Sequence, residues 1–163
     1  MAAESSFDVV SQFDRQELVN AIDQTMREVN TRYDLKGTGS QVRLEKDAIE
    51  LASASEFTLG AVRELLIQRA ARRNLSPKIF DFQKVEPAAR GTVRQTAKLR
   101  QGIDQDLARQ ISKLIRDRVP KVRPQVQGDA VRVSGKNKDD LQAAIKVLRE
   151  QEYPTPLQFV NYR

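Results

Sequence analysis

The 163-residue sequence contains neither cysteine nor histidine. Without cysteine the chain can form no disulfide and has no thiolate nucleophile or metal ligand. Without histidine it lacks the commonest general base and the commonest metal ligand, which excludes serine–histidine triads and typical zinc sites. Catalysis by Asp, Glu, Lys or Arg is still open, but the carboxylates are scattered and form no clear constellation. We therefore expect no enzyme activity, no metal and no cofactor.

Long hydrophobic runs are also missing. No stretch approaches the roughly 20 apolar residues that a membrane-spanning helix needs. The first six residues have neither the basic start nor the apolar run of a signal peptide. The sequence therefore predicts a soluble, cytoplasmic protein that makes no membrane contact.

Positive charge is in excess and is unequally distributed. The chain has 28 Lys and Arg against 22 Asp and Glu, a net charge of +6 and an isoelectric point of about 9.8. If the chain is divided near Arg90, the second half has 15 basic and 8 acidic residues, about +7, and the first half is about −1. Such a balance suits a polyanionic partner for the second half.

Apolar periodicity divides the chain into two similar series of elements. Four strands and two helices are expected in each series. In the first, the strands cover 6–13, 41–47, 48–53 and 78–87, and the helices 14–33 and 56–75. In the second, the strands cover 92–102, 121–129, 130–135 and 157–163, and the helices 103–119 and 138–151. Both halves therefore read strand–helix–strand–strand–helix–strand.

This order is typical of the ferredoxin-like (RNP-like) β-α-β-β-α-β fold of the α+β class. Each such domain is a four-stranded antiparallel sheet with two helices on one face. Two domains are expected, over residues 1–90 and 91–163. Echoes such as Asp47-Ala48-Ile49 and Asp129-Ala130-Val131 favour duplication of one unit. Since repeated units can exchange equivalent elements, either domain could take a strand from the other.

Alternation along the strands of the second half predicts a basic sheet face. Along 92–100 the apolar and basic side chains point to opposite faces. The same parity holds in the next two strands, so five cations are expected on the uncovered face: Arg94, Lys98, Arg100, Arg123 and Arg132. They could bind phosphates; the alternative is a solvated surface whose charges discourage aggregation. In the first half the outward charges roughly cancel: Asp8, Arg43, Glu45 and Glu50.

Aromatic residues are missing from these basic strands, so the base-stacking pattern of classical RNP sheets is absent. Phe80 and Phe82 are expected in the core. Phe159 and Tyr162 should face opposite ways, one in the core and the other available for stacking.

Two loops carry cations next to glycine. Residues 32–39 read RYDLKGTG, for which a helix cap followed by a loop is favoured over a phosphate cradle, because the segment fits no phosphate-binding fingerprint. Residues 134–138 read SGKNK, where a turn with Asn137 or Asp139 capping the next helix is favoured over an anion site, although both can hold together.

Several blocks of the sequence resemble the YajQ family of bacterial nucleotide-binding proteins. These blocks are TRYDLKG, SEFTL, GTVRQTAKLRQGI, VQGDAVRVSGKNKDDLQAAI and PLQFVNYR, and the resemblance runs from Ser6 to Arg163. Tyr33 and Leu35 stand where many members have Phe. The resemblance implies two ferredoxin-like, RNP-like domains that bind nucleotides and RNA, including tRNA in some members. It also implies, for some members, a cyclic di-GMP effector that acts on a transcription regulator.

We therefore expect a monomeric or weakly associating nucleotide-binding protein, a cyclic di-GMP effector that relays the signal through protein partners. GTP and ATP are the other candidate nucleotides, and binding of RNA or tRNA is the alternative function. Phosphate-ester hydrolysis and an adaptor whose basic face meets an acidic protein are the remaining rivals. Phosphates would be bound by Arg94, Lys98, Arg100, Arg123 and Arg132, with Arg32 and Lys36 added from the family block. Bases would stack on Tyr33, Phe159 or Tyr162.

Overall fold

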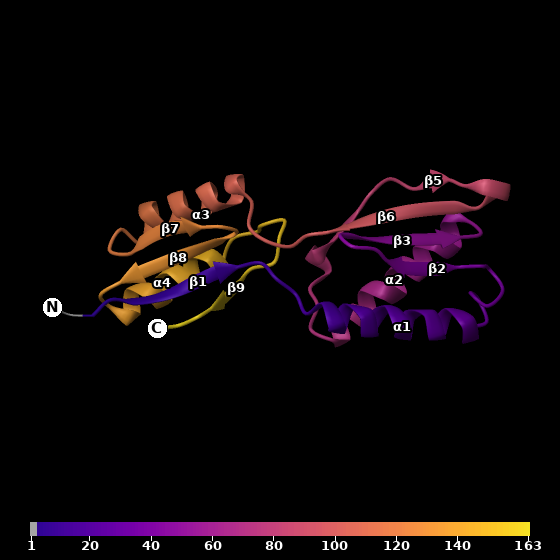
Figure 1. Ribbon diagram of the computed structural model, residues 1–163, viewed down its shortest axis with the longest axis horizontal. Coiled ribbons are helices and arrows are strands. Elements are labelled where there is room, and N and C mark those ends of the chain that lie inside the picture. Colours follow the sequence, from indigo (N-terminus) through magenta and orange to yellow (C-terminus); the bar gives the residue numbers. More distant parts are fainter. Residues whose placement is uncertain (1–2) are drawn as a thin grey trace. The chain divides into compact units, whose positions relative to one another are not determined.

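Two antiparallel sheets organise the chain, and each combines a hairpin of neighbouring strands with strands from other parts of the sequence (Figure 1). The computed structural model describes residues 3–163. Met1 and Ala2 lie outside the described residues; they belong to the first six residues, for which no signal peptide is expected. The chain divides into a central unit, Phe13–Arg100, and a terminal unit made of the described residues up to Gln12 with Gln101–Arg163. No helix in the described part is long and apolar enough to cross a membrane.

The central unit is a sheet with two long helices. Its sheet has the order β2–β3–β6–β4, and the short β5 pairs with β6 beside this path. The strands are β2 (Gln41–Leu44), β3 (Ala48–Ser53), β4 (Phe80–Phe82), β5 (Glu86–Pro87) and β6 (Val93–Leu99), and the helices are α1 (Arg15–Thr31) and α2 (Glu56–Arg72). Two 3-10 turns, η1 (Pro77–Ile79) and η2 (Ala89–Gly91), precede β4 and β6.

The terminal unit repeats this arrangement. Its sheet has the order β7–β8–β1–β9. The strands are β1 (Ser5–Val10), β7 (Arg123–Gln127), β8 (Ala130–Gly135) and β9 (Gln158–Val160), and the helices are α3 (Gln105–Arg118) and α4 (Lys138–Arg149).

Side-chain caps begin the four long helices. Asp14, Ser55, Asp104 and Asn137 each accept a hydrogen bond from a backbone N–H of the first turn. Each cap contributes about 0.5–2 kcal/mol because it satisfies a donor that the helix itself leaves free. Of the two candidates for the cap of α4, it is Asn137 that caps the helix.

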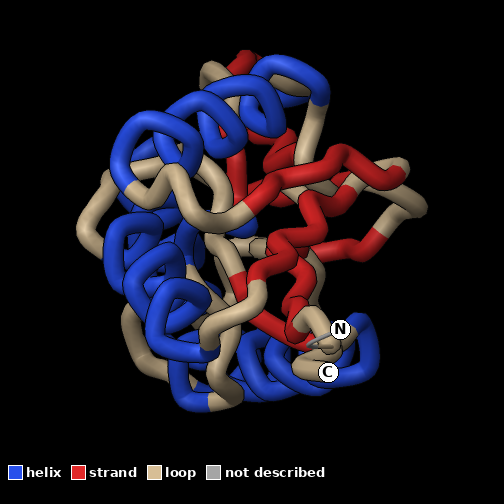
Figure 2. The backbone as a smooth tube through the Cα atoms, turned by 90° about the vertical axis from the view of Figure 1, so that its left-hand side faces the viewer, coloured by secondary structure: helices blue, strands red, loops and turns tan. Residues whose placement is uncertain are grey.

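The helix pair of each unit covers one face of that unit's own sheet, and the core lies between them (Figure 2). In the central unit, Leu51 of β3 and Ala97 of β6 are fully buried beneath the helices. In the terminal unit, Phe7 of β1 is fully buried in the same way. Phe80 is buried and Phe82 packs against the central core, as predicted. The alternate side chains of each sheet point to the uncovered face.

Strand membership differs from the predicted division at residue 90. β1 lies between β8 and β9, with Val9 opposite Val131 and Phe159, while β6 lies between β3 and β4, with Ala97 opposite Ile49. In Figure 1 the indigo β1 accordingly lies among orange and yellow strands, and the pink β6 among purple ones. In both strands core residues alternate with polar ones, with Phe7 and Val9 flanking Asp8 in β1 and Ala97 lying between Thr96 and Lys98 in β6. The local pattern therefore fits either sheet, and only the long-range pairing decides.

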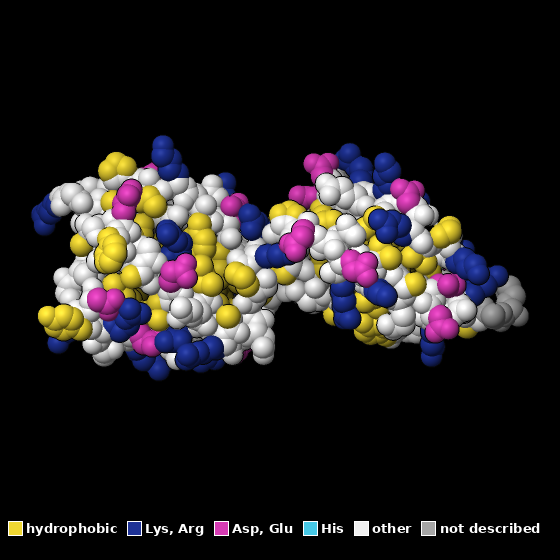
Figure 3. Space-filling model, turned by 180° about the vertical axis from the view of Figure 1, so that it is seen from behind, with side chains coloured by type: hydrophobic (Ala, Val, Ile, Leu, Met, Phe, Trp, Pro, Cys, Tyr) yellow, Lys and Arg dark blue, Asp and Glu magenta, His cyan; other side chains and the backbone are white. Residues whose placement is uncertain are grey.

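This exchange also redistributes the charge. The central unit has 16 basic and 12 acidic residues, a net charge of +4, and the terminal unit has 12 and 10, a net charge of +2. The strong asymmetry expected between the sequence halves is therefore not a property of the folded units. On the face shown in Figure 3, basic and acidic side chains are interspersed.

Candidate functional site

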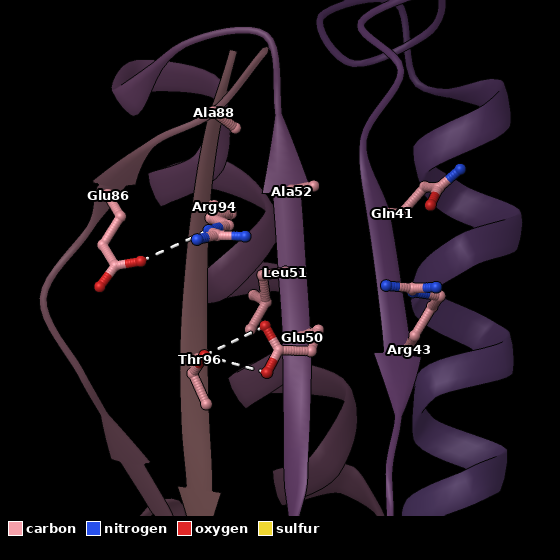
Figure 4. Close-up of a pocket in the computed structure, with 9 residues that line it drawn as sticks. All are labelled: Gln41, Arg43, Glu50, Leu51, Ala52, Glu86, Ala88, Arg94 and Thr96. Carbon is pink, nitrogen blue, oxygen red and sulfur yellow. Dashed lines mark hydrogen bonds and ion pairs between the residues drawn. The ribbon is translucent and has the colours of Figure 1, made fainter.

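A hollow of about 460 Å³ opens on the uncovered face of the central sheet (Figure 4). In the β2–β3 register Arg43 lies opposite Glu50, and in the β3–β6 register Glu50 lies opposite Thr96 and Ala52 opposite Arg94. Three neighbouring strands therefore bring their outward side chains to one place. The lining residues are Gln41, Arg43, Glu50, Ala52, Glu86, Ala88, Arg94 and Thr96, together with Leu51, whose side chain belongs to the core.

Two guanidinium groups line this hollow. Arg43 comes from β2 and Arg94 from β6, on either side of β3 in Figure 4. The guanidinium of Arg43 makes no hydrogen bond or ion pair within the described chain. The Nε of Arg94 lies 3.4 Å from a carboxylate oxygen of Glu86, and both side chains are more than half exposed. An exposed pair of this kind contributes at most about 1 kcal/mol, so an incoming phosphate can replace Glu86.

A carboxylate lies between the two cations. The hydroxyl oxygen of Thr96 is 3.0 Å from each carboxylate oxygen of Glu50. A hydroxyl donates only one hydrogen, so most of the acceptor capacity of Glu50 stays available. The hollow therefore offers strong donors at Arg43 and Arg94 and a strong acceptor at Glu50, which suits a ligand that carries both phosphate and N–H groups.

Two other predicted cations of β6 lie outside this lining. Lys98 is exposed on the same face, opposite Asp81 of β4. Arg100 donates to the carbonyl oxygens of Lys78 and Phe80 at 3.1 and 3.5 Å and lies 3.2 Å from Asp81. Arg100 therefore holds the start of β4 in place.

Arg123 and Arg132 belong to the sheet of the terminal unit, so the five predicted cations do not share one face. Arg123 pairs with Glu4. Arg132 donates to Asp8 at 2.9 Å, and Asn161 donates to the other oxygen of Asp8 at 2.8 Å. The pKa of the Asp8 carboxyl is lowered, mainly by the hydrogen bond from Arg132. Burial opposes this shift, and the hydrogen bond from Asn161 adds to it. Arg132 therefore compensates a buried carboxylate.

The loop after α1 has the conformation of a helix end. The N–H of Arg32 donates to the carbonyl oxygen of Glu28, and its guanidinium pairs with Asp34 at 2.8 Å, which lowers the pKa of the Asp34 carboxyl. Lys36 is exposed, and Tyr33 is fully exposed. These contacts agree with the favoured interpretation of a cap followed by a loop.

The two aromatic residues near the end of the chain do not alternate as expected. Asn161 has a positive φ of 56°, which interrupts the strand between them. As a result both rings lie near the buried Phe7, Phe159 at 6.0 Å and Tyr162 at 6.2 Å between ring centroids. Phe159 is partly buried against the terminal core, with the Arg149 guanidinium 5.3 Å from its ring, whereas Tyr162 is 59% exposed.

Sequence reasoning missed most of the residues that line the central hollow. It placed Arg43 and Glu50 on an outward face but treated their charges as cancelling, and it assigned Arg94 to the other sheet. The missing information was the pairing of β3 with β6, which brings these three residues together.

Comparison with known proteins identifies the family. A model of the family described as "Nucleotide-binding protein YajQ-like" matches residues 5–163. The chain belongs to this family. The resemblance noted in the sequence is thereby confirmed over nearly the whole chain.

Relatives from several bacteria match the chain from end to end. Proteins of Synechococcus sp. (strain JA-3-3Ab) and Trichormus variabilis, both named "Nucleotide-binding protein", are 56% and 57% identical over 163 residues and are covered completely, as is this chain. A protein of Chloroflexus aurantiacus with the same name is 56% identical over 165 residues, again with complete coverage. The YajQ-like family assignment therefore applies to both units together.

Proposed function

We propose that the chain is a cytoplasmic, non-enzymatic receptor that binds a guanine nucleotide, cyclic di-GMP, in the hollow of the central sheet. The observation that carries the proposal is the position of Arg43 and Arg94 on either side of Glu50. The nucleotide-binding names of its relatives and the family resemblance support the ligand class. In this proposal the bound state is relayed to a protein partner, a transcription regulator.

The donors and acceptors of the hollow match guanine better than adenine. Guanine has a ring N–H and an amino group side by side, and a carboxylate such as Glu50 can accept from both. Adenine offers only its amino group on the corresponding edge. Arg43 and Arg94 can then hold phosphate oxygens through charge-assisted hydrogen bonds. The volume of about 460 Å³ falls in the range of about 300–1,000 Å³ typical of small-molecule sites.

The proposal includes a ferredoxin-like fold for each unit. The strand orders β2–β3–β6–β4 and β7–β8–β1–β9, each with two helices on one face, support it. In this fold the uncovered sheet face is free to bind ligand, because both helices occupy the other face.

Calorimetric titration tests the site directly. Cyclic di-GMP, GTP, ATP and a short single-stranded RNA are titrated into the intact protein at two salt concentrations. We expect selective binding of cyclic di-GMP, and we expect Arg43→Ala/Arg94→Ala to raise its Kd by about 100-fold, since each lost charge-assisted hydrogen bond costs about 1.5–3 kcal/mol. Glu50→Gln should reduce the preference for guanine over adenine nucleotides.

The matched control is Arg27→Ala/Arg116→Ala, which removes two exposed arginines, one from each unit, outside the hollow. It should bind cyclic di-GMP like the unmodified protein. If both double variants lose the same affinity, the contribution is general charge and the site assignment fails. Binding of RNA that weakens steeply with salt, without nucleotide selectivity, would instead indicate the RNA-binding alternative. Nucleotide breakdown during the titration would contradict the non-enzymatic part.

A further inference from the structure

A second hollow, of about 320 Å³, lies wholly within the terminal unit. The start of β1, the first two turns of α4 and the segment after β9 surround it. Ser6, Lys138, Leu141, Gln142, Tyr162 and Arg163 are among its lining residues. None of these residues belongs to the central hollow.

An exposed aromatic ring forms one wall of this hollow. Tyr162 is 59% exposed, and the fully buried Phe7 lies behind it with 6.2 Å between ring centroids. The segment that carries the ring is fixed because Ser6 and Arg163 exchange two backbone hydrogen bonds, of 3.2 and 3.0 Å. Leu141, only 6% exposed, supplies an apolar surface from α4. A planar base could therefore stack on a ring that is already held in position.

Two cations line the same hollow. Lys138 is exposed at the start of α4, and its ammonium group makes no hydrogen bond or ion pair within the described chain. Arg163 lowers the pKa of Asp8 through space, but the hydrogen bonds to that carboxylate come from Arg132 and Asn161. The guanidinium of Arg163 therefore keeps its donors available for a phosphate.

We propose that this hollow is a second nucleotide site, which takes a purine mononucleotide. The base stacks on Tyr162 beside Leu141, the amide of Gln142 meets the base edge, and the phosphate lies between Lys138 and Arg163. The site is independent of the central hollow and uses a different mode of recognition, with an aromatic ring in place of a carboxylate. Stacking accepts any base because every base has a π face, so AMP and GMP should both bind.

The three tyrosines of the chain, Tyr33, Tyr153 and Tyr162, provide a direct readout. The intact protein is labelled with 3-fluorotyrosine, its three ¹⁹F resonances are assigned by single Tyr→Phe substitutions, and AMP or GMP is titrated. We expect the Tyr162 resonance to shift in a saturable manner. The Tyr33 and Tyr153 resonances should stay in place, because neither residue lines this hollow.

Two comparisons test the phosphate position. Adenosine, which lacks the phosphate, should bind at least about tenfold more weakly than AMP. Lys138→Ala should raise the Kd for AMP by about tenfold, since a hydrogen bond to a charged group contributes about 1.5–3 kcal/mol. The matched control Lys121→Ala, another exposed lysine of the terminal unit, should leave the AMP titration unchanged. Equal effects of the two lysine substitutions would overturn the proposal.

The central hollow is tested separately in the same assay. Arg43→Ala/Arg94→Ala should leave the Tyr162 shift intact, since those residues line only the central hollow. A Tyr162 resonance that does not move at millimolar AMP and GMP, or that moves together with the fully exposed Tyr33, would refute the second site. Neither result would bear on cyclic di-GMP binding by the central unit.

Discussion

Asp8 is a charged residue in an unusually buried position, with only 7% of its surface exposed at the middle of β1. Its carboxylate is stabilised by hydrogen bonds from Arg132 of β8 and from Asn161, which follows β9. Burying a carboxylate without such partners would be strongly unfavourable. The stability of the terminal unit should therefore depend on the ionisation of this group.

The pH dependence follows from the direction of the shift. The pKa of Asp8 is lower in the folded protein than its ordinary value of 3.8, so its stabilising contribution is present above that value and is lost as the pH falls through the folded pKa. Asp8→Asn should lower the Tm at pH 7, and the Tm difference from the unmodified protein should shrink below about pH 4. Thermal denaturation of the two proteins, monitored by circular dichroism between pH 7 and pH 2, measures both the Tm difference at pH 7 and its decrease at low pH.

The carboxyl pKa values of Glu28 and Asp34 are also lowered, by Arg69 and Arg32 respectively. Both groups are present in the variant and in the unmodified protein, so the Tm difference between the two proteins isolates the effect of Asp8. Asp23→Asn, at an exposed position on α1, is the control. A Tm difference for Asp8→Asn that does not change with pH would contradict the assigned role of its charge.

Two structural features favour glycine at position 102. Its φ is +85°, and a Cβ built there would lie 3.0 Å from a carboxylate oxygen of Asp129. Gly128 has a φ of +60° but open space around it. Either Ala substitution should lower the unfolding free energy by about 1–2 kcal/mol because the backbone is left-handed there. Gly102→Ala also brings its methyl group against Asp129. Urea denaturation should therefore show a larger loss of unfolding free energy for Gly102→Ala, and equal losses would refute the role of Asp129.

The helices and strands were largely predictable from the sequence, whereas their pairing was not. All four long helices lie within their predicted ranges, because caps and apolar periodicity are local signals. The strands predicted over 78–87 and 157–163 are shorter in the structure. The 3-10 turn at Pro77–Ile79 delays β4, and the positive φ of Asn161 follows the end of β9.

Strand parity was predictable even where the sheet was not. Arg94, Lys98 and Arg132 point to uncovered faces as the alternation indicates, but the sequence could not tell which sheet each strand joins. Pairing of β6 with β3 rather than with β8 depends on contacts between residues far apart in the chain, which no local pattern encodes. The candidate site was therefore only partly predictable, because three strands from separate segments build it.

For the whole molecule, the arrangement predicts which fragments fold. The segment 13–100 contains every strand and helix of the central unit, so it should fold on its own. The segment 1–90 lacks β6, which pairs with β3, β4 and β5, and should not unfold cooperatively. Circular dichroism and urea titration of the two fragments compare them directly. Cooperative unfolding of 1–90 together with an unfolded 13–100 would contradict this division.

The backbone bridge between Ser6 and Arg163 has a consequence for how the two units are connected along the chain. It brings residues near the two ends of the sequence side by side. If a short peptide joined those ends and the ring were reopened between Gln12 and Phe13, the central unit would come first and the terminal unit second. An insertion of one domain into another and a tandem pair of domains are thus two linear forms of the same circular path, which differ only in where the circle is opened.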